Sequence, residues 1–188
     1  MSSDIMKFRT FIAIEVPVSD ELRQFSSAIK KSGADLKMVN LKNVHITLKF
    51  LGDTEESLVP EIEQVMKHAV SGIGPFDMRL SGTGAFPNLN RISVVWAGME
   101  NADNLGQIAS KIDAGLTDFG FQPEKRNFSP HVTVARVKTG RNKDRLAEII
   151  NQFSGIDFGE VPVDRIILKK SVLTPQGPIY SDMASVHL

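Results

Sequence analysis

The chain has 188 residues, with 22 Lys+Arg against 22 Asp+Glu, no Cys and 41% hydrophobic residues. This length predicts one domain that builds its core without disulfides or structural zinc, for which there is no cysteine. The zero net charge excludes a protein that coats duplex nucleic acid through a broad basic face, but leaves room for a pocket that holds one phosphate. No apolar run predicts a membrane span or a secretory signal, so we expect a cytoplasmic monomer.

The first half of the chain alternates strand and helix patterns. We expect a frayed start before Lys7, then a strand at Phe8–Val16 that Pro17 ends. Ser19-Asp20 is typical of a helix cap, with an apolar stripe of Leu22, Phe25 and Ile29 and a stop at Gly33. The following elements are a strand at Val44–Leu51 stopped by Gly52-Asp53, a helix at Leu58–Val70 with Pro60 in its first turn, a strand at Phe76–Leu80 and a Gly-rich turn at Ser81–Gly84.

From Arg91 the order of elements repeats. The predicted elements are a strand with Ile92, Val94 and Trp96, a helix at Leu105–Leu116, a strand at His131–Val137, a helix at Leu146–Phe153, and a closing hairpin of Ile166–Leu173 and Ile179–Val186 across the turn Thr174–Pro178. The pattern therefore favours a diverged duplication of two halves, roughly residues 7–88 and 89–188, within a single bilobal domain at 1–188. Terminal strands could be exchanged between the two lobes.

Two of the four histidines lie in the same local string. His45–Leu48 reads His-Ile-Thr-Leu and His131–Val134 reads His-Val-Thr-Val, and each string opens a predicted strand in its own half. Because residues i and i+2 of a strand point to one face, each motif presents an imidazole beside a hydroxyl while the intervening apolar residues enter the core.

Two imidazoles and two hydroxyls facing each other suit a phosphodiester. At neutral pH one ring can be neutral and accept a proton while the other is protonated and donates one. The hydroxyls can donate hydrogen bonds to non-bridging phosphate oxygens. A base, an acid and a phosphate cradle are thus supplied without a metal or cofactor.

The two strings and their flanks, His45–Asp53 and Phe128–Arg136, resemble the paired signatures of the 2H phosphoesterases, in particular the RNA 2′,3′-cyclic phosphodiesterases formerly called 2′-5′ RNA ligases. Further similar segments are Arg9–Ala13, Phe86-Pro87, Val95–Gly98 and Leu173–Tyr180, so the resemblance covers nearly the whole chain. It implies an α+β, bilobed fold in which two antiparallel sheets line a central groove and the helices pack outside.

The resemblance also implies roles for the motif residues. His45 would be the proton donor to the departing ribose 3′ oxygen, and His131 the proton acceptor that activates water, which leaves a 2′-phosphate. Thr47 and Thr133 would hold the phosphate. Run backward, the same chemistry implies a weak 2′-5′ RNA ligase.

Three further substrate-binding residues follow from the same resemblance. Arg136 would add positive charge, and Phe11 and Tyr180 would stack on a base. Strict strand alternation places Arg136 on the face opposite His131, so this role requires a bulge or twist in the strand.

Other interpretations stay open. A metal site is the rival use of two histidines, although catalytic zinc usually needs three protein ligands. The substrate could instead be a small cyclic nucleotide or an ADP-ribose cyclic phosphate, and the protein could be an RNA-end binding module without turnover. The basic residues Lys125, Arg126, Arg136, Lys138, Arg141, Lys143 and Arg145 could guide RNA or simply be solvated. His68 and His187 are expected to have no role.

Overall fold

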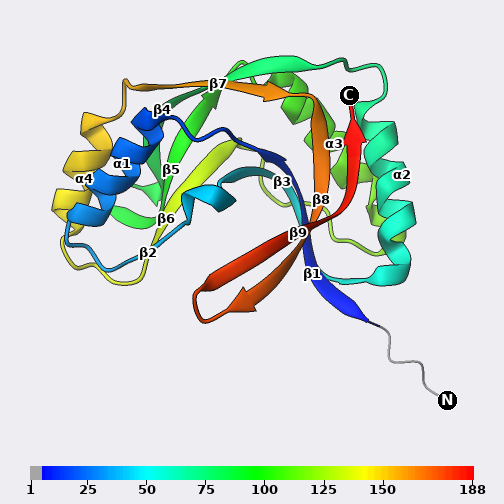
Figure 1. Cartoon of the computed structure of the whole chain (residues 1–188), viewed down its shortest axis with the longest axis horizontal. Coiled ribbons are helices and arrows are strands. Elements are labelled where there is room, and N and C mark those ends of the chain that lie inside the picture. Colours follow the sequence, from blue (N-terminus) through cyan, green and yellow to red (C-terminus); the bar gives the residue numbers. More distant parts are fainter. Residues whose placement is uncertain (1–5) are drawn as a thin grey trace.

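The structure is a computed structural model that describes residues 6–188, and it has the predicted α+β class (Figure 1). The prediction of a frayed start falls almost entirely on residues 1–5, which lie outside the described residues. The strands are β1 (Lys7–Glu15), β2 (Leu36–Met38), β3 (His45–Glu55), β4 (Phe76–Asn88), β5 (Arg91–Glu100), β6 (His131–Val137), β7 (Asp157–Val163), β8 (Arg165–Thr174) and β9 (Gly177–His187). The helices are α1 (Asp20–Lys31), α2 (Val59–Val70), α3 (Asp103–Gly115) and α4 (Lys143–Gln152), with 3₁₀ turns η1 (Leu41–Asn43), η2 (Glu56–Leu58) and η3 (Thr117–Phe119).

The strands form one continuous sheet rather than the two sheets that we expected. Its order is β7-β4-β5-β6-β3-β1-β8-β9, with β2 added to β6, and all pairings are antiparallel. The sheet curls strongly into a half-barrel, as Figure 1 shows. We call β7, β4, β5, β6 and β2 the β6 wing, and β3, β1, β8 and β9 the β3 wing. The wings are joined by the single pair Ile46–Val132, which makes one sheet of what the pattern divides into two.

Helices cover the outer face of each wing. Helices α1 and α4 pack together against the β6 wing, and α2 and α3 pack together against the β3 wing (Figure 1). Each wing takes elements from both halves of the sequence, because α1 and β4 join the β6 wing and the hairpin β8–β9 joins the β3 wing. The assignment of residues 7–88 and 89–188 to two lobes stays a prediction. Among residues 6–188, no helix has the length and apolar character needed to cross a bilayer.

Local chemistry explains the elements that the sequence predicted. The hydroxyl of Ser19 accepts a hydrogen bond from the Leu22 N–H at 3.1 Å and caps α1. The predicted stripe of Leu22, Phe25 and Ile29 is fully buried. Pro60 lies in the first turn of α2, where its missing N–H costs no helical hydrogen bond.

Two predicted strand ends are wrong. β3 continues through Gly52, which adopts a φ of 71° beside an irregularity in the β1–β3 register. The segment Ser81–Gly84 is part of β4 rather than a turn. Gly84 is needed there because a Cβ would lie 2.3 Å from the Trp96 ring, so the glycine makes room for an indole instead of reversing the chain.

Two strands were not predicted from the sequence. β2 has only three residues, and its pairing with β6 depends on residues about a hundred positions away. β7 contains Gly159 and Pro162, residues that lower the strand propensity of its segment. Both strands therefore exist through tertiary pairing rather than local preference.

Candidate active site

The two histidine motifs meet at the junction of the wings. His45 is the first residue of β3 and His131 the first residue of β6, and the strands pair at Ile46–Val132. This antiparallel register aligns His45 with Thr133 and Thr47 with His131. Ile46 and Val132 are both 0% exposed in the core, so the four motif side chains share the opposite face. In regular antiparallel pairs, opposite Cβ atoms lie about 4.5–5.5 Å apart and diagonal neighbours about 7–8 Å, which brings all four residues into one small area.

Both imidazole rings are held in the same way. Nδ1 of His45 lies 2.7 Å from the carbonyl oxygen of Asn43, and Nδ1 of His131 lies 2.7 Å from that of Ser129. A carbonyl oxygen only accepts, so each Nδ1 carries the hydrogen and donates it. Each Nε2 is then the nitrogen left to exchange a proton with a ligand.

Aromatic rings support each imidazole. Phe11 and Tyr180 have ring centroids 4.8 Å and 5.5 Å from that of His45. Phe11 is only 3% exposed and also contacts Tyr180 at 4.9 Å. This burial favours a supporting role for Phe11, and stacking of Phe11 or Tyr180 on a base remains a prediction.

His131 has an aromatic neighbour of its own. The ring of Phe86 lies edge-on at 4.9 Å, and Trp96 lies 5.3 Å from Phe86. Trp96 pairs with Thr133 across β5 and β6, while Gly84 and Gly98 leave the space that its indole fills. From the sequence, Phe86 lies in a string of resemblance and Trp96 in both such a string and a predicted strand, but neither residue was predicted to lie at the site. The strand register decides that Phe86 and Trp96 lie beside His131, and a single sequence does not show this register. The alternation of Ile92, Val94 and Trp96 did indicate on which face of the strand Trp96 lies.

Burial lowers the pKa of both imidazoles from the ordinary value of 6.5. For His45 the effect of burial is partly offset by the hydrogen bond to Asn43, while the positive charges of Lys169 and of a protonated His131 lower the pKa further. For His131, burial acts first, the hydrogen bond to Ser129 opposes it, and Arg136 adds to the lowering. Both rings are therefore mainly neutral at pH 7 in the free protein, and a bound anion would raise the pKa of the ring that must donate.

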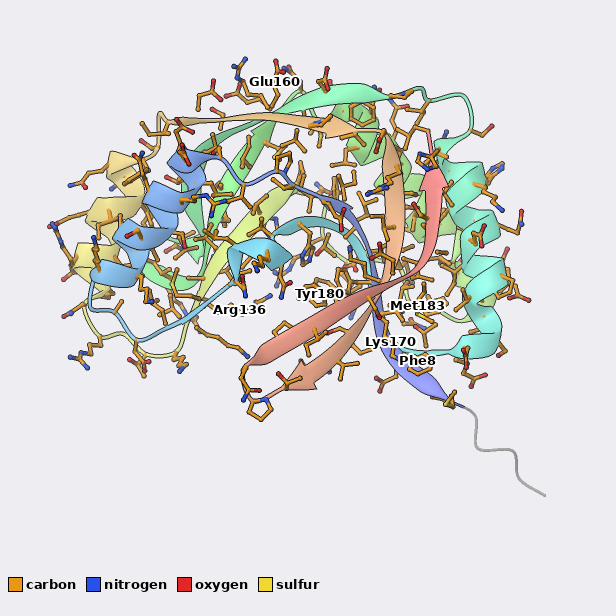
Figure 2. The ribbon with its side chains drawn as sticks, in the orientation of Figure 1. Phe8, Arg136, Glu160, Lys170, Tyr180 and Met183 are labelled. Atoms are coloured by element: carbon orange, nitrogen blue, oxygen red, sulfur yellow. The ribbon has the colours of Figure 1, made fainter. Side chains whose placement is uncertain are left out.

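A β-bulge brings Arg136 to the face of the histidines. Thr133 pairs with Trp96 and Ala135 with Val95, so Val134 is the extra residue and the alternation is reset beyond it. Arg136 pairs with Val94 and lies exposed on the same face as His131. Burial raises the pKa of Tyr180, and the positive charge of Arg136 lowers it, so Arg136 also lies near this phenol. Figure 2 shows Arg136 on β6 and Tyr180 on β9.

β3 carries a matching bulge. Ala13 pairs with Thr47 and Ile12 with Lys49, so Leu48 is the extra residue there. Phe50 consequently returns to the face of His45, at the position that Arg136 occupies in β6. The two motifs thus share a histidine, a threonine two residues on, and a third side chain five residues on, which is Phe50 in one wing and Arg136 in the other.

A buried lysine lies beside His45 and was not predicted. Nζ of Lys169 donates to Glu15 at 2.8 Å and to Asp182 at 2.7 Å, and the residue is 7% exposed. Glu15 pairs with His45 in the sheet. Burial acts to lower the pKa of Lys169, but the bonds to Asp182 and Glu15 outweigh it and raise the pKa. Only the tertiary fold brings these charges together.

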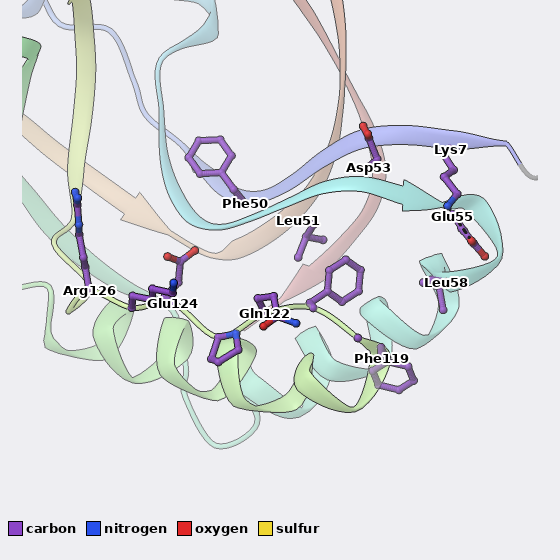
Figure 3. Close-up of a pocket in the computed structure, with 14 residues that line it drawn as sticks. Lys7, Phe50, Leu51, Asp53, Glu55, Leu58, Phe119, Gln122, Glu124 and Arg126 are labelled. Carbon is purple, nitrogen blue, oxygen red and sulfur yellow. Dashed lines mark ion pairs between the residues drawn. The ribbon is translucent and has the colours of Figure 1, made fainter.

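Two cavities of the described residues lie apart from the histidine pair. One of about 690 Å³ lies between the far part of β3 and the segment 119–126 (Figure 3), and another of about 840 Å³ lies beside the start of α3. The paired motifs lie on an open face instead. Within residues 6–188, no cluster of three or more His, Cys, Asp or Glu side chains is arranged to hold a metal ion.

A sequence profile of the 2′-5′ RNA ligase superfamily matches residues 14–171. The chain belongs to this superfamily. The match spans both histidine motifs and most of the sheet, and it agrees with the resemblance of the two motif strings to the 2H phosphoesterases.

Curated relatives within the superfamily cover nearly the whole chain. The RNA 2′,3′-cyclic phosphodiesterase of Methanothermobacter thermautotrophicus is 39% identical over 185 residues, which is 97% of this chain and 100% of the relative. The protein of the same name from Methanocaldococcus jannaschii is 40% identical over 174 residues, 92% of this chain and 96% of the relative.

Two solved structures match the fold of this chain over nearly its whole length. TT0787 of Thermus thermophilus matches with a TM-score of 0.72 at 27% identity, over 96% of this chain and 97% of the other. E. coli LigT complexed with 3′-AMP matches with a TM-score of 0.72 at 20% identity, over 97% and 99%. The second likeness shows the fold alone.

Proposed function

We propose that this chain is an RNA 2′,3′-cyclic phosphodiesterase that hydrolyses the cyclic phosphate at an RNA end to a 2′-phosphate without a metal. The observation that carries the proposal is the matched pair of imidazoles at the Ile46–Val132 junction, each donating through Nδ1 to a backbone carbonyl and leaving Nε2 for the substrate. The names of the relatives, at 39% and 40% identity over nearly the full chain, support the same substrate class.

The reaction divides between the two rings. Nε2 of His131 takes a proton from water, and the water oxygen forms a bond to phosphorus. The bond from phosphorus to the ribose 3′ oxygen breaks, and protonated Nε2 of His45 donates its proton to that oxygen. The products are a 2′-phosphate and a free 3′ hydroxyl, and the base ends protonated while the acid ends neutral.

The other motif residues stabilise charge on the phosphate. Thr47 and Thr133 lie two residues along the strand from their own histidines and directly opposite the histidines of the partner strand, where their hydroxyls can donate to non-bridging oxygens. Arg136 adds positive charge at one end of this area. With the 5′ hydroxyl of a second RNA in place of water, the same residues would support weak 2′-5′ ligation. His131 takes the proton of that hydroxyl, its oxygen bonds to the phosphorus of the cyclic phosphate, the bond to the ribose 3′ oxygen breaks, and His45 protonates that oxygen.

The test is turnover of an oligonucleotide ending in a 2′,3′-cyclic phosphate, with EDTA present. We expect undiminished hydrolysis and a product with the phosphate on the 2′ oxygen. His45→Ala and His131→Ala should each lower kcat by about 10²–10⁴, the typical contribution of general acid or base catalysis.

His68→Ala is the matched control, because His68 lies exposed on α2 away from the motifs. Loss of activity in EDTA would overturn the metal-independent mechanism. A 3′-phosphate product would overturn the assigned leaving group, and unchanged kcat in both motif variants would overturn the assignment of the histidines.

A further inference from the structure

A cavity beside β3 lies apart from the histidine motifs. It has a volume of about 690 Å³, within the range of small-ligand sites, and lies between the strand from Phe50 to Glu55 and the segment 119–126 (Figure 3). Phe50 and Arg126 lie at one end of it, and the ion pair of Lys7 with Glu55 at 3.3 Å lies at the other.

The cavity exists because the two wings differ at this place. In the β6 wing, β2 pairs with Ala135–Val137 and fills the edge of β6. In the β3 wing, within the part of the chain that the structure describes, β3 pairs with β6 only at Ile46, and the segment 119–126 forms no ladder with it. The edge of β3 beyond the junction therefore faces open space instead of a strand.

A buried ion pair fixes the far wall. Lys49 is 2% exposed; its ammonium group is paired with Asp113 and donates to the carbonyl of Gln122 at 2.8 Å. The same carboxylate accepts from the Glu124 N–H at 3.0 Å. These bonds hold the segment in place beside β3, so the cavity is formed before any ligand arrives.

The cavity is continuous with the face that carries the histidines. Phe50 shares that face because of the Leu48 bulge, and its ring lies 6.1 Å from Phe11, which in turn lies 4.8 Å from His45. A strand rises about 3.3 Å per residue, and the cavity continues past Phe50 to Glu55, so its far end lies roughly 25–30 Å along β3 from His45. A ligand that reaches both places must be longer than a terminal nucleoside.

The lining suits a nucleotide. Phe50 and Phe119 present rings that are 61% and 36% exposed. Lys125 and Arg126 on the rim make no ion pair with any side chain of residues 6–188. The lining also holds three acids: Glu55 is paired with Lys7, and the other two are Asp53 and Glu124. Exposed rings next to free cations are how proteins hold single strands, since a base stacks on the ring and a phosphate meets the cation.

We propose that this cavity binds a nucleotide upstream of the terminal one, in an RNA whose 2′,3′-cyclic phosphate lies at His45 and His131. This rests on the proposed function and makes a polymer, rather than a mononucleotide, the preferred substrate. Phe119 stacks on the upstream base, and Arg126 meets a backbone phosphate.

The test is binding, measured with reaction products so that it does not depend on turnover. RNAs of one and five nucleotides ending in a 2′-phosphate compete against a labelled pentanucleotide. We expect the pentanucleotide to bind more tightly than the mononucleotide, and Phe119→Ala to reduce the ratio of the two affinities about 5- to 150-fold, the range for loss of one stacked base. Ile156→Ala is the matched control, because Ile156 is also 36% exposed but lies outside the cavity, and it should keep the ratio.

Arg126→Ala gives a second reading that does not depend on the aromatic ring. The slope of log Kd for the pentanucleotide against log salt should fall by about 0.7, as expected for one lost phosphate contact on a single strand. Lys31→Ala, at the exposed end of α1, should leave the slope unchanged.

Equal affinity for the two lengths in the unmodified protein would overturn the proposal. So would the same ratio in Phe119→Ala as in Ile156→Ala, a result that would assign the open edge of β3 to another occupant such as an extended peptide. Length-dependent binding that Phe119→Ala abolishes, in a protein without turnover, would support the cavity and contradict the proposed function alone.

Discussion

The hydrogen atom on each Nδ1 decides what the two histidines can do. In both rings Nδ1–H donates to the carbonyl oxygen two residues upstream, so both rings present Nε2 to a ligand. The sequence predicted the pairing of each imidazole with a hydroxyl, because i and i+2 of a strand share a face. It could not predict the tautomer, which depends on how the chain enters each strand at Asn43 and Ser129.

The pH dependence of turnover follows from the lowered pKa values. One ring must be neutral and the other protonated, and the fraction of protein in that state is largest midway between the two pKa values. Since burial lowers both from 6.5, kcat/KM should be bell-shaped with its maximum below about pH 6.5. Steady-state rates on a 2′,3′-cyclic mononucleotide would check this, and a flat profile or a maximum above about pH 8 would contradict it.

Lys169→Met tests the charge beside His45. Loss of the ammonium group leaves Asp182 without this cation and Glu15 with Arg165. Because both carboxylates are half exposed and can regain water, we expect a loss of about 1–3 kcal/mol in the free energy of unfolding. Removing a positive charge also raises the pKa of His45, so the maximum of kcat/KM should move to higher pH.

Lys170→Met is the control for that variant. Lys170 is adjacent in sequence but lies over the ring of Phe8 at 3.5 Å, on the other face of β8, and Figure 2 labels both residues. We expect a loss of at most about 1 kcal/mol in urea unfolding and no shift of the pH maximum. A shift of equal size in both variants would show that Lys169 has no specific effect on His45.

At the scale of elements, the bulges in β3 and β6 explain what strict alternation could not. The sequence does not mark Leu48 and Val134 as extra residues, because both are apolar like ordinary core positions. In the structure both are buried, and so are the residues that follow them, Lys49 and Ala135. Only the register against β1 and β5 identifies them. The placement of Arg136 and Phe50 on the site face was therefore beyond sequence reasoning, although the need for a bulge could be stated.

Gly84→Ala tests the close approach of β4 to the Trp96 ring. A Cβ at Gly84 would lie 2.3 Å from the indole, so either the ring or β4 must shift. We expect a loss of about 1–3 kcal/mol in unfolding free energy and a lower kcat, because Trp96 pairs with Thr133.

Gly106→Ala is the opposite case. Gly106 lies within α3 with no atom within 4 Å of its added Cβ, so we expect a gain of about 0.5–1 kcal/mol from helix propensity. Thermal unfolding of both variants would check the pair. Stability unchanged by Gly84→Ala would mean that the ring moves at no cost.

At the scale of the whole molecule, the buried histidines should make stability depend on pH. Their folded pKa values lie below 6.5, so the folded state binds fewer protons than the unfolded chain in mildly acidic solution. Their contribution is complete above about pH 6.5 and is lost as the pH falls through the folded values. Urea midpoints at about pH 7.5 and pH 5 should therefore differ more for the unmodified protein than for the double variant His45→Ala, His131→Ala.

Carboxylates with lowered pKa values do not affect this comparison of urea midpoints between the two proteins. The lowered pKa values of Glu15 and Asp157 add a loss of stability at more acidic pH, but the loss is present in both proteins and cancels in the difference. Equal midpoint shifts in the two proteins would contradict the assignment of buried, neutral rings.

The repeated order of elements was visible in the sequence, and the way in which these elements assemble was not. The repeated order of elements and the two motifs predicted two related sheets, and the closing hairpin was placed correctly at β8 and β9. That the hairpin adds to β1, that β4 joins β5 and β7, and that one pair at Ile46–Val132 joins the wings are facts of long-range pairing. Local propensity and periodicity carry no information on such partners.

Phe50 and Arg136 make the two ends of the histidine face chemically different. Both imidazoles make the same Nδ1 hydrogen bond to a backbone carbonyl, so these bonds do not distinguish the two rings. A symmetric ligand could therefore bind in either orientation. An arginine stands at one end of the junction and an exposed ring at the other, at corresponding places in the two strands. An RNA strand has unlike ends, so we expect this difference between the two strands, together with the open edge of β3, to fix the direction in which an RNA lies across the imidazoles.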